Sequence, residues 1–172
     1  DVDLRTIAIN LGKDIAQKNW TVVYGGAKIG MMGLVADAAL AEDGEVIGVI
    51  PTHLKKVEVA HTGITKVHET QDMHTRKALM ESLSDAFAVL PGAFGTLDEF
   101  FEILTWKQLG IHNKEIILLN KNGYFDGQEK FFNSGISEEF IKEDIMKVFQ
   151  IVDTVDGFIE MLIKSFGFET TG

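Results

Sequence analysis

The sequence predicts a single doubly wound (Rossmann-like) α/β domain, with a mainly parallel sheet and helices on both faces. Short, almost continuous apolar runs of strand length alternate with segments whose apolar residues recur at helical spacing. Strands that are apolar on both sides are typical of parallel sheets covered on both faces. No Pro/Gly/Ser-rich linker or internal repeat divides the 172 residues, and Pro51 and Pro91 each stand at the end of a predicted strand. We therefore expect one domain over residues 1–172.

The first half of the chain is predicted to contain three helices and three strands. Leu4, Ile7, Leu11 and Ile15 recur at helical spacing, which predicts an amphipathic opening helix. The runs WTVVY and EVIGVIP are continuously apolar, as in buried strands, whereas ITKVHE alternates between apolar and polar residues. In chain order we expect a helix over 2–19, a strand over 20–24, a helix over 32–42, strands over 45–51 and 64–69, and a helix over 75–84.

The second half continues the alternation. The runs DAFAVLPG, EIILLN and VFQIVD are predicted strands, and LDEFFEILTWKQLG is a strongly periodic helix that ends at Gly110. In order we expect a strand over 85–92, a helix over 97–110, a strand over 115–120, short helices over 126–134 and 137–143, a strand over 148–153 and a helix over 154–166. Domains of this class usually open on a strand, so we expect a first strand to be missing ahead of the opening helix.

The composition excludes several classes of function. The formal net charge is −10 and no run of Lys/Arg exceeds two residues, so no nucleic-acid polymer is expected as a partner. There is no cysteine, and the five histidines lack a metal-binding spacing, so we expect no metal site. No apolar run reaches ~18 residues and no signal peptide opens the chain, which favours a cytoplasmic protein without membrane contact.

The stretch LPGAFGTLDEF, over residues 90–100, is the first candidate for a binding site. Ligands of open parallel sheets bind at the carboxyl ends of the strands, where this turn is predicted to lie. Gly92 and Gly95 allow close approach of a ligand and positive φ, and the N-terminus of the following helix suits a phosphate. The alternative is a structural turn in which Thr96 caps the helix, and Asp98 and Glu99 complement its dipole.

Two further stretches fall at the same predicted edge. YGGAKIGMMG places four glycines between a strand and a helix, where Gly25, Gly26, Gly30 and Gly33 form a backbone cradle for an anion. The alternative is that Gly30 and Gly33 only permit close helix–strand packing. In MHTRK, Arg76 heads an otherwise apolar helical face, and Lys77 follows it at the start of the helix. Arg76 is therefore a candidate for ligand binding, and an ion pair with a nearby carboxylate is its alternative role.

These motifs, taken together, resemble the LOG ("Lonely Guy") family of cytokinin riboside 5′-monophosphate phosphoribohydrolases, often mislabelled lysine decarboxylases. PGAFGTLDE is similar to the family's P-G-G-x-G-T-x-x-E motif, MHTRK to its Arg-Lys element, and YGGAKIGMMG to its G-G-G-x-x-G-L-M-G turn. VADAAL, EVIGVIPTHL, SDAFAVLPG and TWKQLGIHNK are also similar, so the resemblance covers about residues 4–125. The departures are Ala27 and Ala93 in place of motif glycines, Met31 for Leu and Asp98 for Glu.

The resemblance implies hydrolysis of the N-glycosidic bond of adenosine 5′-monophosphate or an N6-modified derivative, giving free base and ribose 5-phosphate. It implies no cofactor, and at least a homodimer. Arg76 and Glu99 match the family's catalytic pair. The positions that match its substrate contacts are Glu58, Lys77, Gly92, Ala93, Phe94, Gly95, Thr96, Leu97, Asp98 and Thr105, beside the glycine turn of Gly25, Gly26 and Gly30.

The reaction builds positive charge on the ribose, which a fixed carboxylate stabilises. We assign that role to Glu99 and a positioning role to Arg76, whose pKa above ~12 makes it a poor proton donor. The acid that protonates the leaving base stays unassigned. The competing interpretation is a non-catalytic nucleotide or molybdopterin carrier or sensor of the same fold, which needs the anion cradle but not Arg76 and Glu99 together.

Overall fold

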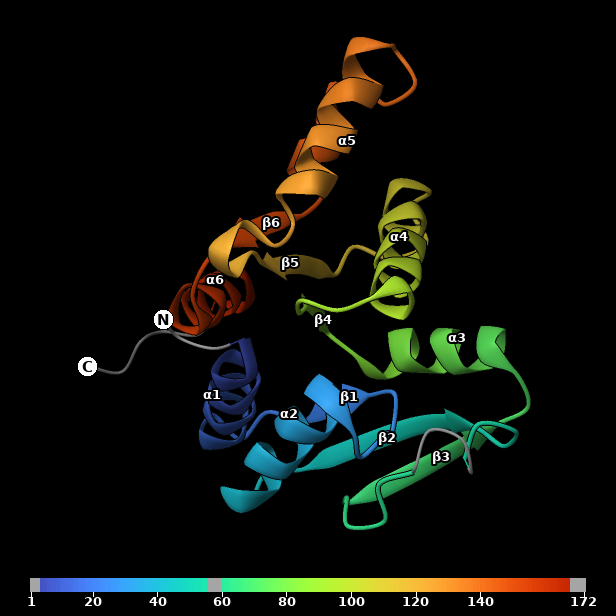
Figure 1. Cartoon of the computed structure of the whole chain (residues 1–172), viewed down its shortest axis with the longest axis vertical. Coiled ribbons are helices and arrows are strands. Elements are labelled where there is room, and N and C mark those ends of the chain that lie inside the picture. Colours follow the sequence, from blue (N-terminus) through green and yellow to red (C-terminus); the bar gives the residue numbers. More distant parts are fainter. Residues whose placement is uncertain (1–3, 56–59, 168–172) are drawn as a thin grey trace. The chain divides into compact units, whose positions relative to one another are not determined.

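The computed structural model describes residues 4–55 and 60–167. The chain divides into two compact units, Asp1–Ser84 and Asp85–Gly172 (Figure 1). Each unit is built on a parallel three-stranded sheet with helices packed against it, so the α/β class and the parallel strands are confirmed. The expected sheet is present as two sheets, with strand orders β1-β2-β3 and β4-β5-β6.

In the first unit, β2 is the central strand. Its neighbouring residues Val49 and Ile50 point to opposite faces of the sheet and are both fully buried, so both faces are covered. Helices α1 and α2 pack against each other, and α2 and α3 both contact β1 and β2. The elements are α1 (Leu4–Gln17), β1 (Val22–Tyr24), α2 (Gly30–Ala41), β2 (Val46–Pro51), β3 (Lys66–Thr70) and α3 (Met73–Leu83).

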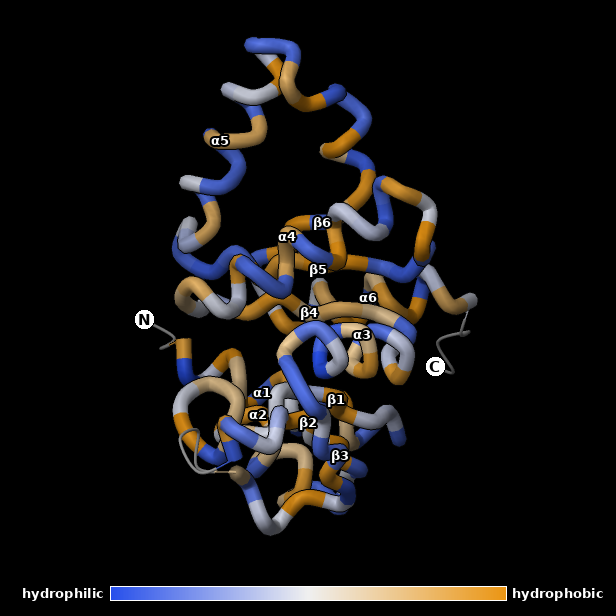
Figure 2. The backbone as a smooth tube through the Cα atoms, turned by 90° about the vertical axis from the view of Figure 1, so that its right-hand side faces the viewer, coloured by the Kyte–Doolittle hydropathy of each residue, from blue (hydrophilic) through white to orange (hydrophobic). Residues whose placement is uncertain are grey.

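In the second unit, β5 is central. Its residues from Ile116 to Leu119 are at most 1% exposed, and the chain there is hydrophobic throughout (Figure 2). Helix α6 packs on β5 and β6. The elements are β4 (Ala86–Val89), α4 (Phe94–Gln108), β5 (Glu115–Leu119), the 3₁₀ helix η1 (Lys121–Gly123), α5 (Asp126–Ser137), the 3₁₀ helix η2 (Glu143–Lys147), β6 (Gln150–Val152) and α6 (Val155–Phe166).

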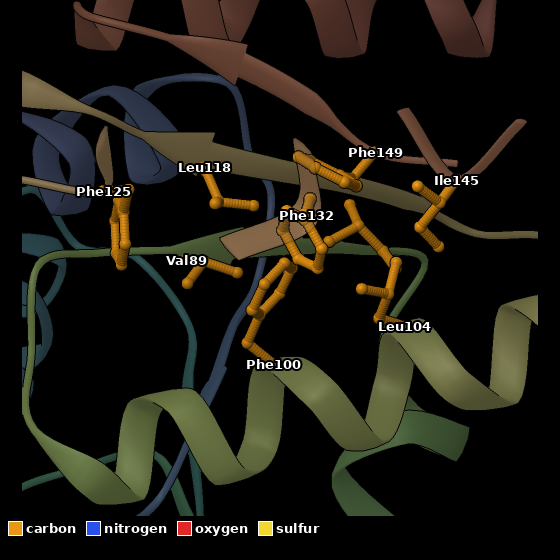
Figure 3. Close-up of a cluster of buried hydrophobic side chains, with 9 residues drawn as sticks. Val89, Phe100, Leu104, Leu118, Phe125, Phe132, Ile145 and Phe149 are labelled. Carbon is orange, nitrogen blue, oxygen red and sulfur yellow. The ribbon is translucent and has the colours of Figure 1, made fainter. Parts of the chain in front are cut away.

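A cluster of buried aromatic and aliphatic side chains holds α4 and α5 to this sheet (Figure 3). The rings of Phe100, Phe132 and Phe149 meet with centroids 5.4–6.4 Å apart, two of the three pairs edge to face. Because Phe100 directly follows Glu99 in α4, burial of its ring fixes the rotation of the helix that carries the predicted carboxylate. The cluster comprises Val89, Phe100, Leu104, Ile116, Leu118, Phe125, Phe132, Ile145 and Phe149.

Two predicted elements differ from those observed. The helix predicted over 137–143 is wrong: α5 runs to Ser137, the chain turns over 138–142, and a 3₁₀ helix follows. Glu139 has φ of 60° in that turn, which no helix permits. The helix predicted over 97–110 begins earlier, at Phe94, so the PGAFGT motif supplies the first helical turn and not only the loop before it.

Candidate functional site

The first glycine turn, between β1 and α2, contacts the side chain of Arg76. Arg76 is only 4% exposed, and its Nη2 donates to the carbonyl oxygen of Gly25 at 3.4 Å. A Cβ added to Gly25 would lie 2.0 Å from that same Nη2, so residue 25 must be glycine for the guanidinium to occupy this place. Gly26 has φ of 79°, a conformation that side-chain-bearing residues rarely adopt.

Helix α3 carries Arg76 and positions its side chain at this turn. The carboxylate of Asp72 caps the helix, accepting from the backbone N–H of Thr75 at 2.8 Å and from its hydroxyl at 2.9 Å. These bonds, the backbone one first, hold the pKa of Asp72 below its usual range. Arg76 is the only buried residue of α3, whereas Leu83 on the predicted apolar face is 37% exposed. The helix therefore buries its arginine in preference to an apolar residue, which is costly unless the charge is paired or hydrogen-bonded.

A second segment braces the same turn from the other side. The backbone N–H of His61 donates to Gly26 O at 2.9 Å, and Ala27 forms an antiparallel bridge with Ala60. His61 is 4% exposed, with Nε2 2.9 Å from a carboxylate oxygen of Asp37 on α2. Its Nδ1 accepts from the backbone of Gly63, so Nε2 carries the proton and donates to Asp37. Ala27 is 1% exposed and does not have positive φ, so its backbone is not strained by alanine at a motif glycine.

The other glycines of this turn have separate roles. Gly30 has φ of 65° with no atom near its missing Cβ, so its conformation, and not packing, requires glycine. A Cβ on Gly33 would lie 1.9 Å from Lys28 O, so Gly33 permits close packing of the turn on its own helix. Packing therefore accounts for Gly33, whereas a part for Gly25, Gly26 and Gly30 in an anion cradle stays a prediction.

The second glycine loop joins β4 to α4. Its cap residue, Ala93, has φ of −93° and makes no side-chain cap hydrogen bond, so alanine is unstrained there and the first N–H groups of α4 lack a side-chain cap. Thr96 lies inside the helix, which rules out the interpretation of Thr96 as the N-cap. An uncapped N-terminus of a 15-residue helix has the polarity that suits an anion.

Neither glycine of this loop has positive φ, contrary to the expectation for Gly92 and Gly95. A Cβ on Gly92 would lie 2.1 Å from the hydroxyl oxygen of Thr96, so the missing side chain makes room for the threonine to fold back over the loop. Gly95 has no atom within 4 Å of its missing Cβ. It leaves open space above the first helical turn, as close approach of a ligand requires.

A pocket of about 220 Å³ opens beside this loop. Tyr124 and Gln128, which follow β5, are among its lining residues, and the hydroxyl of Tyr124 donates to Gly92 O at 2.8 Å. Sequence reasoning missed these two residues, although the loop after β5 has to lie beside the loop after β4 because the strands are parallel neighbours. The pocket is lined by Gly92, Ala93, Phe94, Leu97, Tyr124 and Gln128.

The remaining predicted site residues fall into three groups. Glu99 and Lys77 are half-buried near the starts of α4 and α3, and Asp98 is exposed. Thr105 is exposed, and its hydroxyl donates to Phe101 O at 2.7 Å within the helix, as an ordinary helix-face hydroxyl does. Glu58 lies outside the described residues. The functional roles of all these residues stay predictions.

Among residues 4–55 and 60–167, no group of three or more His, Cys, Asp or Glu side chains is arranged to hold a metal ion. Within the same ranges, no helix has both the length and the apolar character needed to cross a membrane.

Comparison with protein families gives one match over residues 32–162, to the family described as possible lysine decarboxylase. A cytokinin riboside 5′-monophosphate phosphoribohydrolase from Rhodococcoides fascians is 48% identical over 136 residues, covering 78% of this chain and 69% of the relative. A probable enzyme of the same name from Oryza sativa subsp. japonica is 43% identical over 141 residues, covering 82% and 63%. A third, from Arabidopsis thaliana, is 46% identical over 134 residues, covering 78% and 67%. The chain thus spans about two thirds of the length of these relatives.

Among solved structures, a molybdenum cofactor binding protein from Rippkaea orientalis matches 95% of this chain and 87% of its own, with a TM-score of 0.70 and 25% identity. The molybdenum cofactor carrier protein of Chlamydomonas reinhardtii matches 95% and 88%, with a TM-score of 0.71 and 22% identity. These likenesses establish the Rossmann-like fold, whereas the sequence relatives are nearly twice as similar in identity.

Proposed function

This chain belongs to the LOG family, and we propose that it hydrolyses the N-glycosidic bond of a nucleoside 5′-monophosphate to free base and ribose 5-phosphate. The observation that carries the proposal is identity of 43–48% to proteins named cytokinin riboside 5′-monophosphate phosphoribohydrolase, over about four fifths of the chain. Adenosine 5′-monophosphate and its N6-modified derivatives are the substrate class. Water is the second substrate, so the reaction consumes no cofactor.

The phosphate of the substrate binds at the start of α4. The uncapped N–H groups of the first helical turn supply donors, Gly95 leaves the space above them open, and the helix dipole favours negative charge. This location suits a chain with net charge −10, because the donors are backbone groups and require no basic patch. Binding the phosphate there places the anomeric carbon of the ribose for attack.

Glu99 is the catalytic carboxylate of this proposal. It lies one turn after the uncapped helix start, and its backbone is held by burial of Phe100. As the bond to the base breaks, positive charge develops on the ribose, and a fixed carboxylate stabilises that charge and orients the attacking water. Arg76 and Lys77 enter the proposal through the family's Arg-Lys element, as the cations that offset the negative charge of the phosphate.

Arg76 serves here as a positioning and electrostatic group. Its guanidinium is buried and hydrogen-bonded to Gly25 O, and a fixed orientation of this kind is what transition-state stabilisation requires. Proton donation by arginine is disfavoured at neutral pH. The site residues Glu58, Asp98 and Thr105 enter the proposal only through the family motif.

A non-catalytic carrier is the alternative, and the structural likeness to molybdenum cofactor carriers is the observation that favours it. Incubation of the purified chain with AMP, followed by chromatography for adenine and ribose 5-phosphate, separates the two functions. The enzyme releases both products in equal amounts with multiple turnovers. A carrier binds nucleotide, which raises its thermal stability, and releases no base.

A panel of nucleoside monophosphates then defines the preferred base. We expect adenine nucleotides with and without an N6 substituent to be cleaved, and the corresponding nucleosides without phosphate to be cleaved far more slowly. The proposal includes activity on AMP itself, a homodimer or higher homo-oligomer, a cytoplasmic location and no role for nucleic-acid polymers. Gel filtration with light scattering tests the oligomeric state.

A further inference from the structure

Tyr124 lies outside the PGAFGTLDE motif but contacts the loop between β4 and α4 that begins this motif. Its hydroxyl donates to the carbonyl oxygen of Gly92 at 2.8 Å, and the residue, 46% exposed, lines the pocket together with Ala93 and Phe94. Nothing in the sequence motifs, or in the reaction chemistry described above, assigns this residue a role. The contact nevertheless falls on the residue directly before Ala93, the N-cap of the helix whose first N–H groups are proposed to hold the phosphate.

The bond controls the direction of a specific donor. The carbonyl oxygen of Gly92 and the N–H of Ala93 belong to the same planar trans peptide unit, so they point in opposite directions. Holding the oxygen toward Tyr124 therefore turns the N–H of Ala93 away from the tyrosine. Gly92 has no side chain of its own to fix this peptide, and the space that a side chain would need is filled by Thr96.

Tyr124 is itself held by a tightly bonded turn after β5. Its backbone N–H donates to Lys121 O at 3.3 Å, and the next residue, Phe125, donates to the side-chain oxygen of Asn120 at 2.6 Å. The Phe125 ring is 1% exposed and meets the Tyr124 ring edge to face, with centroids 5.3 Å apart. The turn is thus anchored in the core of the second unit, and the tyrosine hydroxyl transmits that anchoring to the loop.

We propose that Tyr124 is a positioning residue for phosphate recognition, whose hydroxyl orients the Gly92–Ala93 peptide so that the Ala93 N–H is aimed at the substrate phosphate. The inference rests on the proposed function for the identity of the ligand. The hydrogen bond from Tyr124 to Gly92 O is neutral and is made to the loop, not to the substrate, yet it lowers the KM for nucleoside monophosphates.

The test compares Tyr124→Phe with the parent chain, using AMP as substrate and ribose 5-phosphate as competing product. The variant keeps the ring and removes only the hydroxyl. We expect KM for AMP and the inhibition constant of ribose 5-phosphate both to rise about fivefold, as expected for loss of one neutral hydrogen bond, with kcat changed less than twofold. A purely structural role would instead lower the melting temperature and leave both constants at the parental values.

Ser137→Ala is the matched control. It also removes a hydroxyl that donates to a backbone carbonyl in the second unit, Ser134 O at 2.9 Å, and we expect parental KM and kcat. Tyr124→Leu removes the ring as well as the hydroxyl and should raise KM at least as far as Tyr124→Phe does. A rise with Tyr124→Leu alone would overturn the proposal, because the ring and not the hydroxyl would then matter.

The outcome for Tyr124 is separable from the outcome for the proposed function. If the parent chain does not cleave AMP, the hydrolase proposal fails, and the role of Tyr124 is tested by calorimetric titration with AMP. About fivefold weaker binding by Tyr124→Phe would then support the positioning role. Equal AMP affinity of parent and variant, or equal KM where the parent is active, would overturn it.

Discussion

Gly25→Ala isolates the link between the first glycine turn and Arg76. The new Cβ would lie 2.0 Å from Arg76 Nη2 and 3.1 Å from Cζ, whereas non-bonded atoms of this kind need about 3.5 Å. The guanidinium must therefore move by roughly 1.5 Å, the difference between those distances. Because the obstructed atom is at the far end of a long side chain, the backbone can stay in place while the hydrogen bond to Gly25 O is lost.

This combination predicts a change in activity without a comparable change in folding. Misplacement of a catalytic group by about 1 Å can lower the rate about 100-fold, so we expect kcat/KM for AMP to fall by about that factor. Release of adenine measures the activity, and thermal unfolding followed by circular dichroism measures the stability. We expect the melting temperature of Gly25→Ala to stay close to that of the parent.

Gly127→Ala is the matched control for the glycine substitution. Gly127 lies near the start of α5, without positive φ and with no atom within 4 Å of its missing Cβ, so alanine fits there and favours the helix. Its kcat/KM should equal that of the parent. Parental activity in Gly25→Ala as well would refute the argument that residue 25 sets the position of a catalytically important Arg76.

Two further predictions concern titration and stability. Asp72→Ala should lower the melting temperature at neutral pH, because it removes the cap of α3. Folding lowers the pKa of Asp72. The stabilising effect of this carboxylate is therefore complete above the usual carboxyl pKa of about 3.9, and it is lost as pH falls through the pKa of the folded state. The melting temperatures of parent and variant should therefore converge in acid, and a constant gap would contradict the assignment. Burial, followed by the charge of Asp37, raises the pKa of Tyr24 to about 12, so its neutral form favours folding below about pH 10 and this contribution is lost as pH rises toward 12. In Tyr124→Phe, where Tyr24 is the remaining tyrosine of two, tyrosinate absorbance of the folded chain should have its midpoint near pH 12; a midpoint near the ordinary value of about 10 would contradict the burial.

The strands and most helices were predictable because their apolar runs reflect burial directly. EIILL appears as β5 and VIGVIP as β2, each buried on both faces, as continuous apolar runs indicate. The turn over 138–142 was not predictable in the same way. The apolar residues Phe140 and Ile141 are compatible with the apolar face of a helix. In the structure, however, Phe140 is 89% exposed and Glu139 has a left-handed backbone conformation.

The motifs of the candidate site were predictable from the sequence, but the structural reason for each motif residue was not. The glycines of PGAFGT indicated a special backbone, but Gly92 is needed because Thr96 fills its space and not for positive φ. The burial of Arg76 against Gly25 O joins residues 51 positions apart, which no local pattern contains. The same holds for Tyr124, whose hydroxyl is hydrogen-bonded to a residue 32 positions earlier in the chain. A contact over that distance produces no periodic pattern in the sequence.

The central claim is that this chain is an N-glycosyl hydrolase in which backbone groups at the start of α4 hold the phosphate and Glu99 acts on the sugar. Glu99→Gln tests it most directly, because the amide preserves size and removes the negative charge. We expect the variant to bind AMP with near-parental affinity in calorimetric titration while its turnover falls by about two orders of magnitude or more. Release of adenine at the parental rate by Glu99→Gln would contradict the account.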